Sequence, residues 1–142
     1  MPQVYIGRCR SYEQAGVDAA IRQAVAALGG IERFVQPGQR IMLKPNLLLL
    51  KGPETAICTH PAIVQAVAAM VREAGAVPLI ADSSGGGTSH NPRSLRSLYR
   101  ISGMEQAAAA SGAELNMDCE GLEVPCLRSE ERRVGKECQS VC

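Results

Sequence analysis

The sequence predicts an α/β fold: a mostly parallel sheet with helices on both faces, of the Rossmann-like type. Short segments rich in β-branched and aliphatic residues alternate with longer segments whose apolar residues recur at helical spacing. The connections between them are short, and glycine or proline marks most of the boundaries. Strands that alternate with helices in this way form βαβ units and therefore a parallel sheet. We expect the chain to contain an incomplete domain of this type.

A strand, a helix and a second strand are expected in the first part of the chain. Residues 4–7 favour the first strand, because they are apolar and end at a glycine. A helix is expected over residues 17–28, where apolar residues recur every three or four positions. Gly29 and Gly30 end this helix. After a proline–glycine turn, residues 40–43 are expected to form the second strand, and a long loop follows.

A second helix and a third strand follow this loop. Thr59 suits the N-cap position of the helix, and Pro61 is tolerated in its first turn. An apolar stripe continues to Val71, and Gly75 stands where a C-cap glycine is expected. Residues 77–81 favour the third strand.

Two more helices and a fourth strand are expected in the last part. Asn91 and Pro92 have the cap-and-proline order that starts a helix. An alanine-rich helix is expected over residues 104–111, and it ends at a glycine. Residues 115–117 favour the fourth strand.

Residues 128–142 differ from the rest of the chain, because they show no apolar period and are densely charged. They hold four of the 15 Lys and Arg residues and three of the 14 Asp and Glu residues. Residues 128–138 also correspond to a translation of DNA that resembles a standard short-read sequencing adapter. We therefore expect residues 1–127 to be the N-terminal part of a single α/β domain, and residues 128–142 to be a non-native, adapter-derived tail.

Charge and composition argue against several classes of partner. Without residues 128–142, the chain carries 11 residues of each charge, so its body is neutral. A neutral body with no Trp and one Phe gives no reason to expect a nucleic-acid partner. No apolar run approaches the roughly 18 residues that a membrane span needs. Since the N-terminus also lacks a signal-peptide layout, we expect a cytoplasmic protein with no membrane partner.

Lys44, Pro45 and Asn46 directly follow the second expected strand. Pro45 disfavours helix at the residue before it, so the chain must leave the sheet extended. Ligands of open α/β sheets bind beyond the carboxyl ends of the strands, so Lys44 and Asn46 are candidates to bind a small anionic molecule. The same residues also suit a simple strand-exit turn with a solvated lysine.

The third expected strand leads into a second candidate segment, which contains a carboxylate, two serines and three glycines. The carboxylate suits a metal, a hydroxyl or a proton in transit, and it equally suits a cap on the loop's own N–H groups. The glycines permit positive φ and a nest of N–H groups for an anion. Their spacing matches neither a dinucleotide-binding fingerprint nor a P-loop. The candidate ligand-binding residues of this segment are Asp82, Ser83, Ser84, Gly85, Gly86 and Gly87.

Other candidates flank these two segments. Cys58 and His60 precede the second helix, and together with Asp82 they offer ligands for a metal ion. A histidine at a helix start is also a common capping or surface residue. A further group suits either an anionic ligand or a solvated helix face: His90, Arg93 and Arg96.

Several motifs, in this order, resemble the domain of unknown function 362 family. They are residues 42–48 around Lys44-Pro45-Asn46, residues 59–61 with a helix that ends at residues 72–76, and residues 80–87. Residues 101–104 and 113–118 continue the resemblance, which covers roughly residues 3–125. The resemblance implies a cytoplasmic α/β protein that is longer than this chain and often carries a ferredoxin-like module with [4Fe–4S] clusters.

The resemblance also implies a redox role and a redox partner, with the cluster in a C-terminal part that this sequence does not contain. No C-x-x-C-x-x-C run occurs here, so no cluster is expected on these residues. We therefore expect an uncharacterised α/β fragment that binds a small anionic ligand at the carboxyl ends of its strands. One alternative is a nucleotide- or phosphate-binding enzyme without a cluster, and another is a non-functional truncated fragment.

Overall fold

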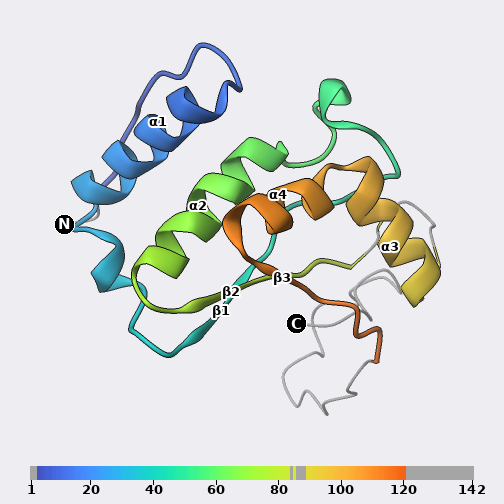
Figure 1. The fold of residues 1–142 in the computed structure, drawn as a ribbon. Helices are drawn as coiled ribbons and strands as arrows, with labels where there is room; N and C mark the ends of the chain where they lie inside the picture. Colours follow the sequence, from blue (N-terminus) through green and yellow to red (C-terminus); the bar gives the residue numbers. More distant parts are fainter. Residues whose placement is uncertain (1–2, 84, 86–88, 121–142) are drawn as a thin grey trace, which may run out of the picture.

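The computed structural model describes residues 3–83, 85 and 89–120 (Figure 1). Our predicted tail at residues 128–142 lies outside this part. No helix in the described part is long and apolar enough to cross a membrane. In chain order the elements are α1 (Gln14–Ala27), the 3-10 helix η1 (Ile31–Arg33), β1 (Arg40–Leu43), the 3-10 helix η2 (Pro53–Thr55), α2 (Pro61–Glu73), β2 (Val77–Ile80), α3 (Pro92–Ile101), α4 (Met104–Ser111) and β3 (Glu114–Leu115).

The three strands form one parallel sheet in the order β1-β2-β3. The predicted α/β class and parallel sheet are thus confirmed. The central strand β2 contains Pro78, which has no N–H for strand pairing. Pairing with β3 begins only at Leu79, and the N–H groups of Val77 and Ala81 are directed to the β1 side. Pro78 therefore lies where β2 needs no donor toward β3.

The helices of the described residues lie on one face of the sheet. α2 and α4 lie side by side against the strands, and α1 packs on the outer flank of α2 (Figure 1). The strand order runs in one direction, so right-handed crossovers place both connecting helical segments on the same face. The opposite face exposes Met42 at 57% and Val77 at 41%. We predicted helices on both faces, and among the described residues they cover only one.

Two predicted strands differ from the structure. Residues 4–7 form no strand, and Val4 and Ile6 are 84% and 90% exposed. Their side chains favour β-structure, but a strand needs a pairing neighbour and a surface to pack on, and this segment has neither among the described residues. The predicted strand at residues 115–117 begins earlier, as β3, and ends at Leu115. It ends there because the next side chain, Asn116, accepts from the Asp118 N–H in a turn.

We predicted Thr59 as the N-cap of α2, but the structure shows that His60 is the N-cap. His60 Nδ1 accepts a hydrogen bond from the Ala62 N–H at 3.2 Å. Thr59 instead pairs with Asn46: its hydroxyl accepts from the Asn46 N–H, and its own N–H donates to the Asn46 carbonyl, both at 2.9 Å. The predicted start of α3 is confirmed, since the N-cap Asn91 accepts from the Ser94 N–H.

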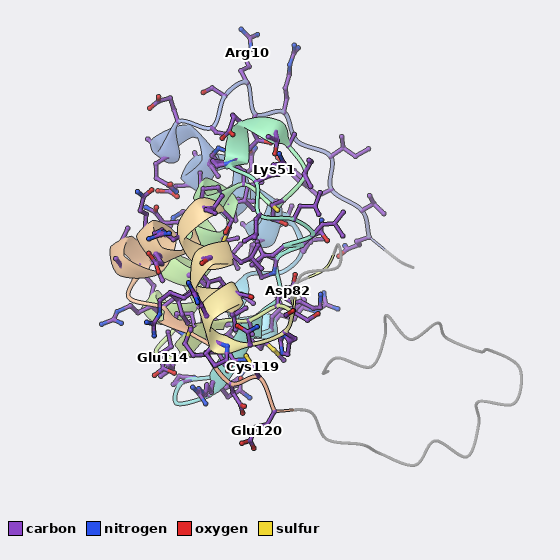
Figure 2. All side chains as sticks on the ribbon, turned by 90° about the vertical axis from the view of Figure 1, so that its right-hand side faces the viewer. Arg10, Lys51, Asp82, Glu114, Cys119 and Glu120 are labelled. Carbon is purple, nitrogen blue, oxygen red and sulfur yellow. The ribbon has the colours of Figure 1, made fainter. Side chains whose placement is uncertain are left out.

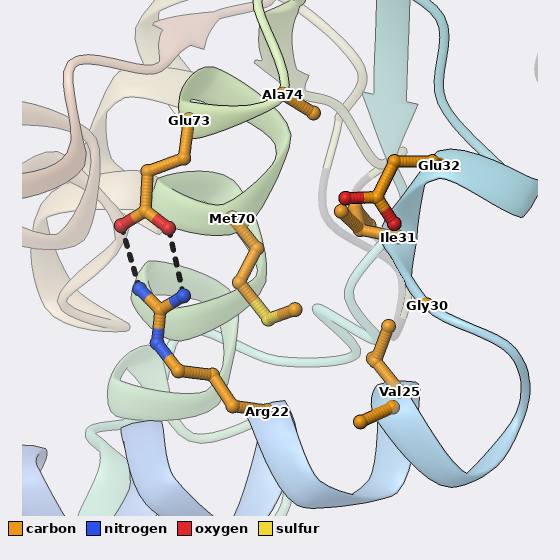
Figure 3. A pocket seen from close by; sticks show the side chains of 9 residues that line it. Arg22, Val25, Gly30, Ile31, Glu32, Met70, Glu73 and Ala74 are labelled. Carbon is orange, nitrogen blue, oxygen red and sulfur yellow. Dashed lines mark hydrogen bonds and ion pairs between the residues drawn. The ribbon is translucent and has the colours of Figure 1, made fainter.

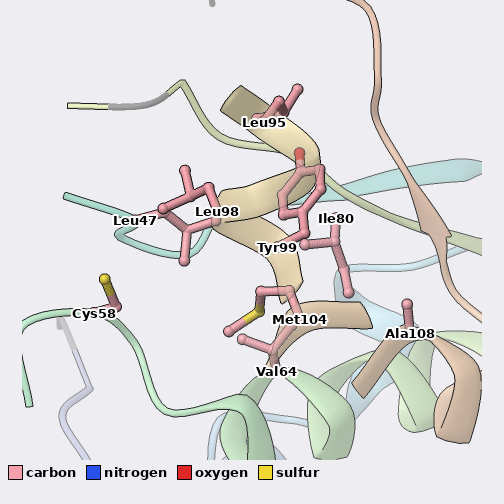
Figure 4. Close-up of a cluster of buried hydrophobic side chains, with 9 residues drawn as sticks. All are labelled: Leu47, Cys58, Val64, Ile80, Leu95, Leu98, Tyr99, Met104 and Ala108. Atoms are coloured by element: carbon pink, nitrogen blue, oxygen red, sulfur yellow. The ribbon is translucent and has the colours of Figure 1, made fainter. Parts of the chain in front are cut away.

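One cluster of buried side chains joins the loop after β1 to α2, β2, α3 and α4 (Figure 4). Leu47 belongs to that loop and has no exposed surface, so its burial fixes the loop backbone next to Lys44. Tyr99 is the aromatic member of the cluster. The other members are Cys58, Val64, Ile80, Leu95, Leu98, Met104 and Ala108. The core therefore positions the segments that leave the carboxyl ends of the strands.

An ion pair links α1 to α2. Arg22 donates two hydrogen bonds to Glu73, at 2.7 and 2.6 Å, beside Met70 (Figure 3). These hydrogen bonds raise the pKa of Arg22 and lower the pKa of Glu73. Both side chains are about half exposed, so the pair contributes at most about 1 kcal/mol. They border an open groove of about 370 Å³ between the two helices.

Candidate functional site

The structure brings Lys44 and Asp82 together at the carboxyl ends of β1 and β2. Lys44 Nζ donates a hydrogen bond to Asp82 Oδ1 at 2.6 Å. The Lys44 side chain is 64% exposed, whereas the Asp82 side chain is 5% exposed. The other carboxylate oxygen, Oδ2, accepts from the Leu47 N–H at 2.7 Å. A buried carboxylate therefore holds an exposed ammonium group at the edge of the sheet.

Asn46 has a structural role within the loop. Its Nδ2 donates to the Ile57 carbonyl at 3.1 Å, and its backbone N–H and carbonyl both pair with Thr59. Asn46 thus ties the first turn of the loop to its last residues and holds the backbone that carries Lys44. The binding of an anion by its amide stays a prediction.

The glycine segment is described only in part. Asp82, Ser83 and Gly85 lie in the described part of the chain, and Ser84, Gly86 and Gly87 lie outside it. Ser83 is partly exposed beside Asp82.

Gly85 is required for a close approach between the two loops. The glycines of this segment permit positive φ, but Gly85 does not use that freedom. A Cβ at Gly85 would lie 2.9 Å from Leu48 Cδ1 and 3.1 Å from the Leu48 carbonyl oxygen. A larger residue would therefore require Leu48 to shift, so here the missing side chain of glycine serves the packing of the two loops.

Tyr99 is a residue of this edge that sequence reasoning did not find. It comes from α3, has no exposed surface, and donates its hydroxyl to the Asn116 carbonyl at 2.9 Å, just after β3. Burial raises the pKa of Tyr99 to about 12, and a backbone hydrogen bond from Asp82 opposes this rise. Tyr99 therefore lies beneath the exits of β2 and β3. The available signal was its place on the apolar face of α3, four positions after Leu95 and next to Leu98.

The three residues considered for a metal ion have separate roles. Cys58 is buried in the core cluster, and its thiol donates to the Leu49 carbonyl at 3.4 Å. His60 caps α2 and stacks on Tyr12, with ring centroids 3.7 Å apart. Asp82 pairs with the ammonium group after β1. Within residues 3–83, 85 and 89–120, no three His, Cys, Asp or Glu side chains are grouped to hold a metal ion.

Cysteines are the usual ligands of an iron–sulfur cluster, so their positions matter for the expected [4Fe–4S] cluster. Those of the described part are Cys9, which is exposed, Cys58, which is buried, and Cys119, which is partly buried. In the described part of the chain, no three His, Cys, Asp or Glu side chains are grouped around these cysteines to hold a metal ion, and the expectation that no [4Fe–4S] cluster lies on these residues stays a prediction.

His60 makes the stability of the fold depend on pH. Burial lowers the pKa of His60 from its ordinary value of 6.5. The folded chain then binds this proton more weakly than the unfolded chain, so stability rises with pH through the window below 6.5. We expect the free energy of unfolding to fall as the pH is lowered from 6.5 toward the shifted pKa, because a proton on Nδ1 removes the cap acceptor.

Two variants isolate this effect in denaturant titrations. His60→Ala should lose about 1 kcal/mol at neutral pH, the usual value of an N-cap side chain. His60→Asn keeps a cap acceptor and does not titrate, so it should remain stable and lack this part of the pH dependence. An unchanged pH dependence in His60→Asn would show that another group is responsible.

The remaining candidates lie near the start of α3. Both ring nitrogens of His90 are buried and have no hydrogen-bond partner among the described residues. Arg93 and Arg96 are exposed on α3, and their binding of an anion together with the Lys44–Asp82 pair stays a prediction.

Comparisons with known proteins agree with the resemblance seen in the motifs. Thylakoid-associated protein sll1697 of Synechocystis sp. is 45% identical to this chain over 76 residues. That match covers 54% of the chain and 24% of the relative, so the chain matches about a quarter of the relative's length. No solved structure matches the chain.

A family match covers more of the chain. The family described as Domain of unknown function (DUF362) matches residues 41–139. This range overlaps the segment that we predicted to be an adapter-derived tail, and that origin stays a prediction. Because the match spans well over half of the sequence, the protein belongs to the domain of unknown function 362 family.

Proposed function

We propose that this protein binds a small anionic ligand at the carboxyl ends of its parallel strands, with Lys44 as the cationic contact. The observation that carries this proposal is the Lys44–Asp82 ion pair, in which the carboxylate is buried and the ammonium group is exposed. An ammonium group has three N–H donors, and Asp82 occupies one of them. Among the residues that the structure describes, Asp82 is the hydrogen-bond partner found for this group, which leaves its other donors to a ligand from the solvent.

The fixed position of the ammonium group favours binding. A mobile surface lysine loses side-chain freedom when it binds an anion, and this loss weakens the affinity. Lys44 is already held by Asp82, which is held in turn by the N–H of the buried Leu47. The edge beyond the carboxyl ends of parallel strands is also where open α/β sheets bind their ligands.

We also propose that this unit belongs to a larger cytoplasmic redox protein with a [4Fe–4S] cluster outside residues 1–127. Membership of the family supports this proposal, and the described residues supply no ligand group for the cluster. Iron and sulfide analysis of the complete protein, purified without oxygen, tests it. A complete protein with neither iron nor sulfide would contradict it.

Calorimetric titration of the 142-residue chain with inorganic phosphate and a panel of nucleotides and carboxylates tests the anion-binding proposal. We expect Lys44→Gln to weaken the binding of the best ligand about tenfold, since a hydrogen bond to a charged group contributes about 1.5–3 kcal/mol. Lys51→Gln is the matched control, because Lys51 is an exposed lysine of the same loop that lies apart from Asp82 (Figure 2). Equal affinities of the two variants, with both folded, would contradict the proposal.

A further inference from the structure

Three arginines line the exposed side of α3. Arg93, Arg96 and Arg100 are three and four positions apart, so they lie on one side of the helix, and all three are exposed. α3 contains no acidic residue. Its opposite side holds the buried residues Leu95, Leu98 and Tyr99, which fix the helix on the core.

This arrangement is unfavourable for the helix alone. Like charges three or four positions apart repel one another along a helix surface. Arg93 also lies in the first turn, where the positive end of the helix dipole disfavours a cation. The ion pairs found among the described residues involve Arg22, Arg40 and Lys44, so these pairs leave the arginines of α3 unneutralised. The stability of the helix therefore gives no reason for three neighbouring arginines without an acidic residue on α3.

The three arginines border one groove. It has a volume of about 260 Å³ and is lined by Pro92, Arg93, Arg96, Ser97 and Arg100. Each guanidinium group presents N–H donors in a planar fork that matches phosphate oxygens. The volume lies below the usual range of about 300–1,000 Å³ for drug-sized ligands, so the groove suits a compact anion.

We infer that this groove is a second ligand site, which binds a compact anion with two or more phosphate groups. Two phosphates give each of several guanidinium groups an oxygen partner and relieve the repulsion among them. A membrane surface is less well matched, because interfacial helices combine basic residues with a large exposed apolar face, and the groove is lined by polar and charged residues with one proline. A single-stranded nucleic acid is also less well matched, because the groove contains no aromatic ring for base stacking.

Calorimetric titration of the 142-residue chain with pyrophosphate tests this inference. We expect saturable binding that Arg96→Gln weakens about tenfold and Arg96→Lys weakens less, because lysine keeps the charge but loses the fork. Arg8→Gln removes an exposed charge from the N-terminal segment and should leave the affinity unchanged. Absence of saturable binding, or an equal loss in Arg8→Gln, would overturn the inference.

Two further arms distinguish the α3 groove from the strand-end site and from a macromolecular partner. Lys44→Gln should leave unchanged the loss of pyrophosphate binding that Arg96→Gln causes, so failure of the strand-end site and failure of the α3 site are distinguishable. Two other probes are tested in parallel: vesicles that contain an anionic lipid, and a free polyglutamate peptide. If either one binds through Arg96 more tightly than pyrophosphate does, the compact-ligand assignment is wrong. Arg96→Gln should melt at the same or a slightly higher temperature, since it relieves like-charge repulsion, so its loss of binding cannot be attributed to unfolding.

Discussion

Asp82→Ala is expected to lower the free energy of unfolding by about 2–4 kcal/mol, because it removes an ionised acceptor from two hydrogen bonds. One bond fixes Lys44, and the other satisfies the Leu47 N–H. The bond to Lys44 contributes the smaller share, because the lysine is largely exposed and water replaces its partner. The bond to Leu47 contributes more, because that residue is buried and its N–H would lose its acceptor.

Urea unfolding of matched variants checks this result. Asp82→Asn keeps an oxygen for the Leu47 N–H and should lose about half as much stability as Asp82→Ala. Asp118→Ala is the control, because Asp118 is an exposed aspartate that also accepts a backbone hydrogen bond, from Glu120 at 2.8 Å. It should cost less than about 1 kcal/mol. Equal losses in Asp82→Ala and Asp118→Ala would mean that the buried carboxylate does not join the two loops.

Tyr99→Ala is expected to have the largest effect on stability, a loss of about 3–5 kcal/mol, the usual cost of removing a buried aromatic side chain. Tyr99 has no exposed surface and contacts the core cluster from α3. Tyr99→Phe keeps the ring and loses only the hydrogen bond to the Asn116 carbonyl, so it should cost about 1–1.5 kcal/mol. Tyr12→Phe, at a tyrosine that is 57% exposed, should change stability by less than about 0.5 kcal/mol.

The pKa of Tyr99 adds a second test. Burial raises this pKa from 10.0 to about 12, so the folded chain retains the phenol proton more strongly than the unfolded chain. The corresponding stabilisation is present below pH 10 and is lost as the pH rises toward about 12. Tyr99→Phe should lack this decline. If wild-type and Tyr99→Phe lose stability in parallel across this window, the hydroxyl is not held as the structure shows.

The candidate site was only partly readable from the sequence. Lys44 and Asp82 were predicted because each directly follows an apolar strand, and that signal is local. Tyr99 was missed because its hydroxyl bonds to the segment after β3, which the helical pattern of α3 does not reveal. His60 was considered for a metal ion, and its local geometry instead makes it a helix cap.

The sequence by itself determined the α/β class, the strand at residues 40–43 and the helix start at Asn91. These depend on side-chain periodicity and on cap and turn residues, which act within a few positions. Only the tertiary structure decided that residues 4–7 form no strand, that the described helices share one face, and that Lys44 meets Asp82 across 38 positions of the chain. Strand pairing, handed crossovers and ion pairs between distant residues depend on which segments become neighbours, and local propensity does not contain that information.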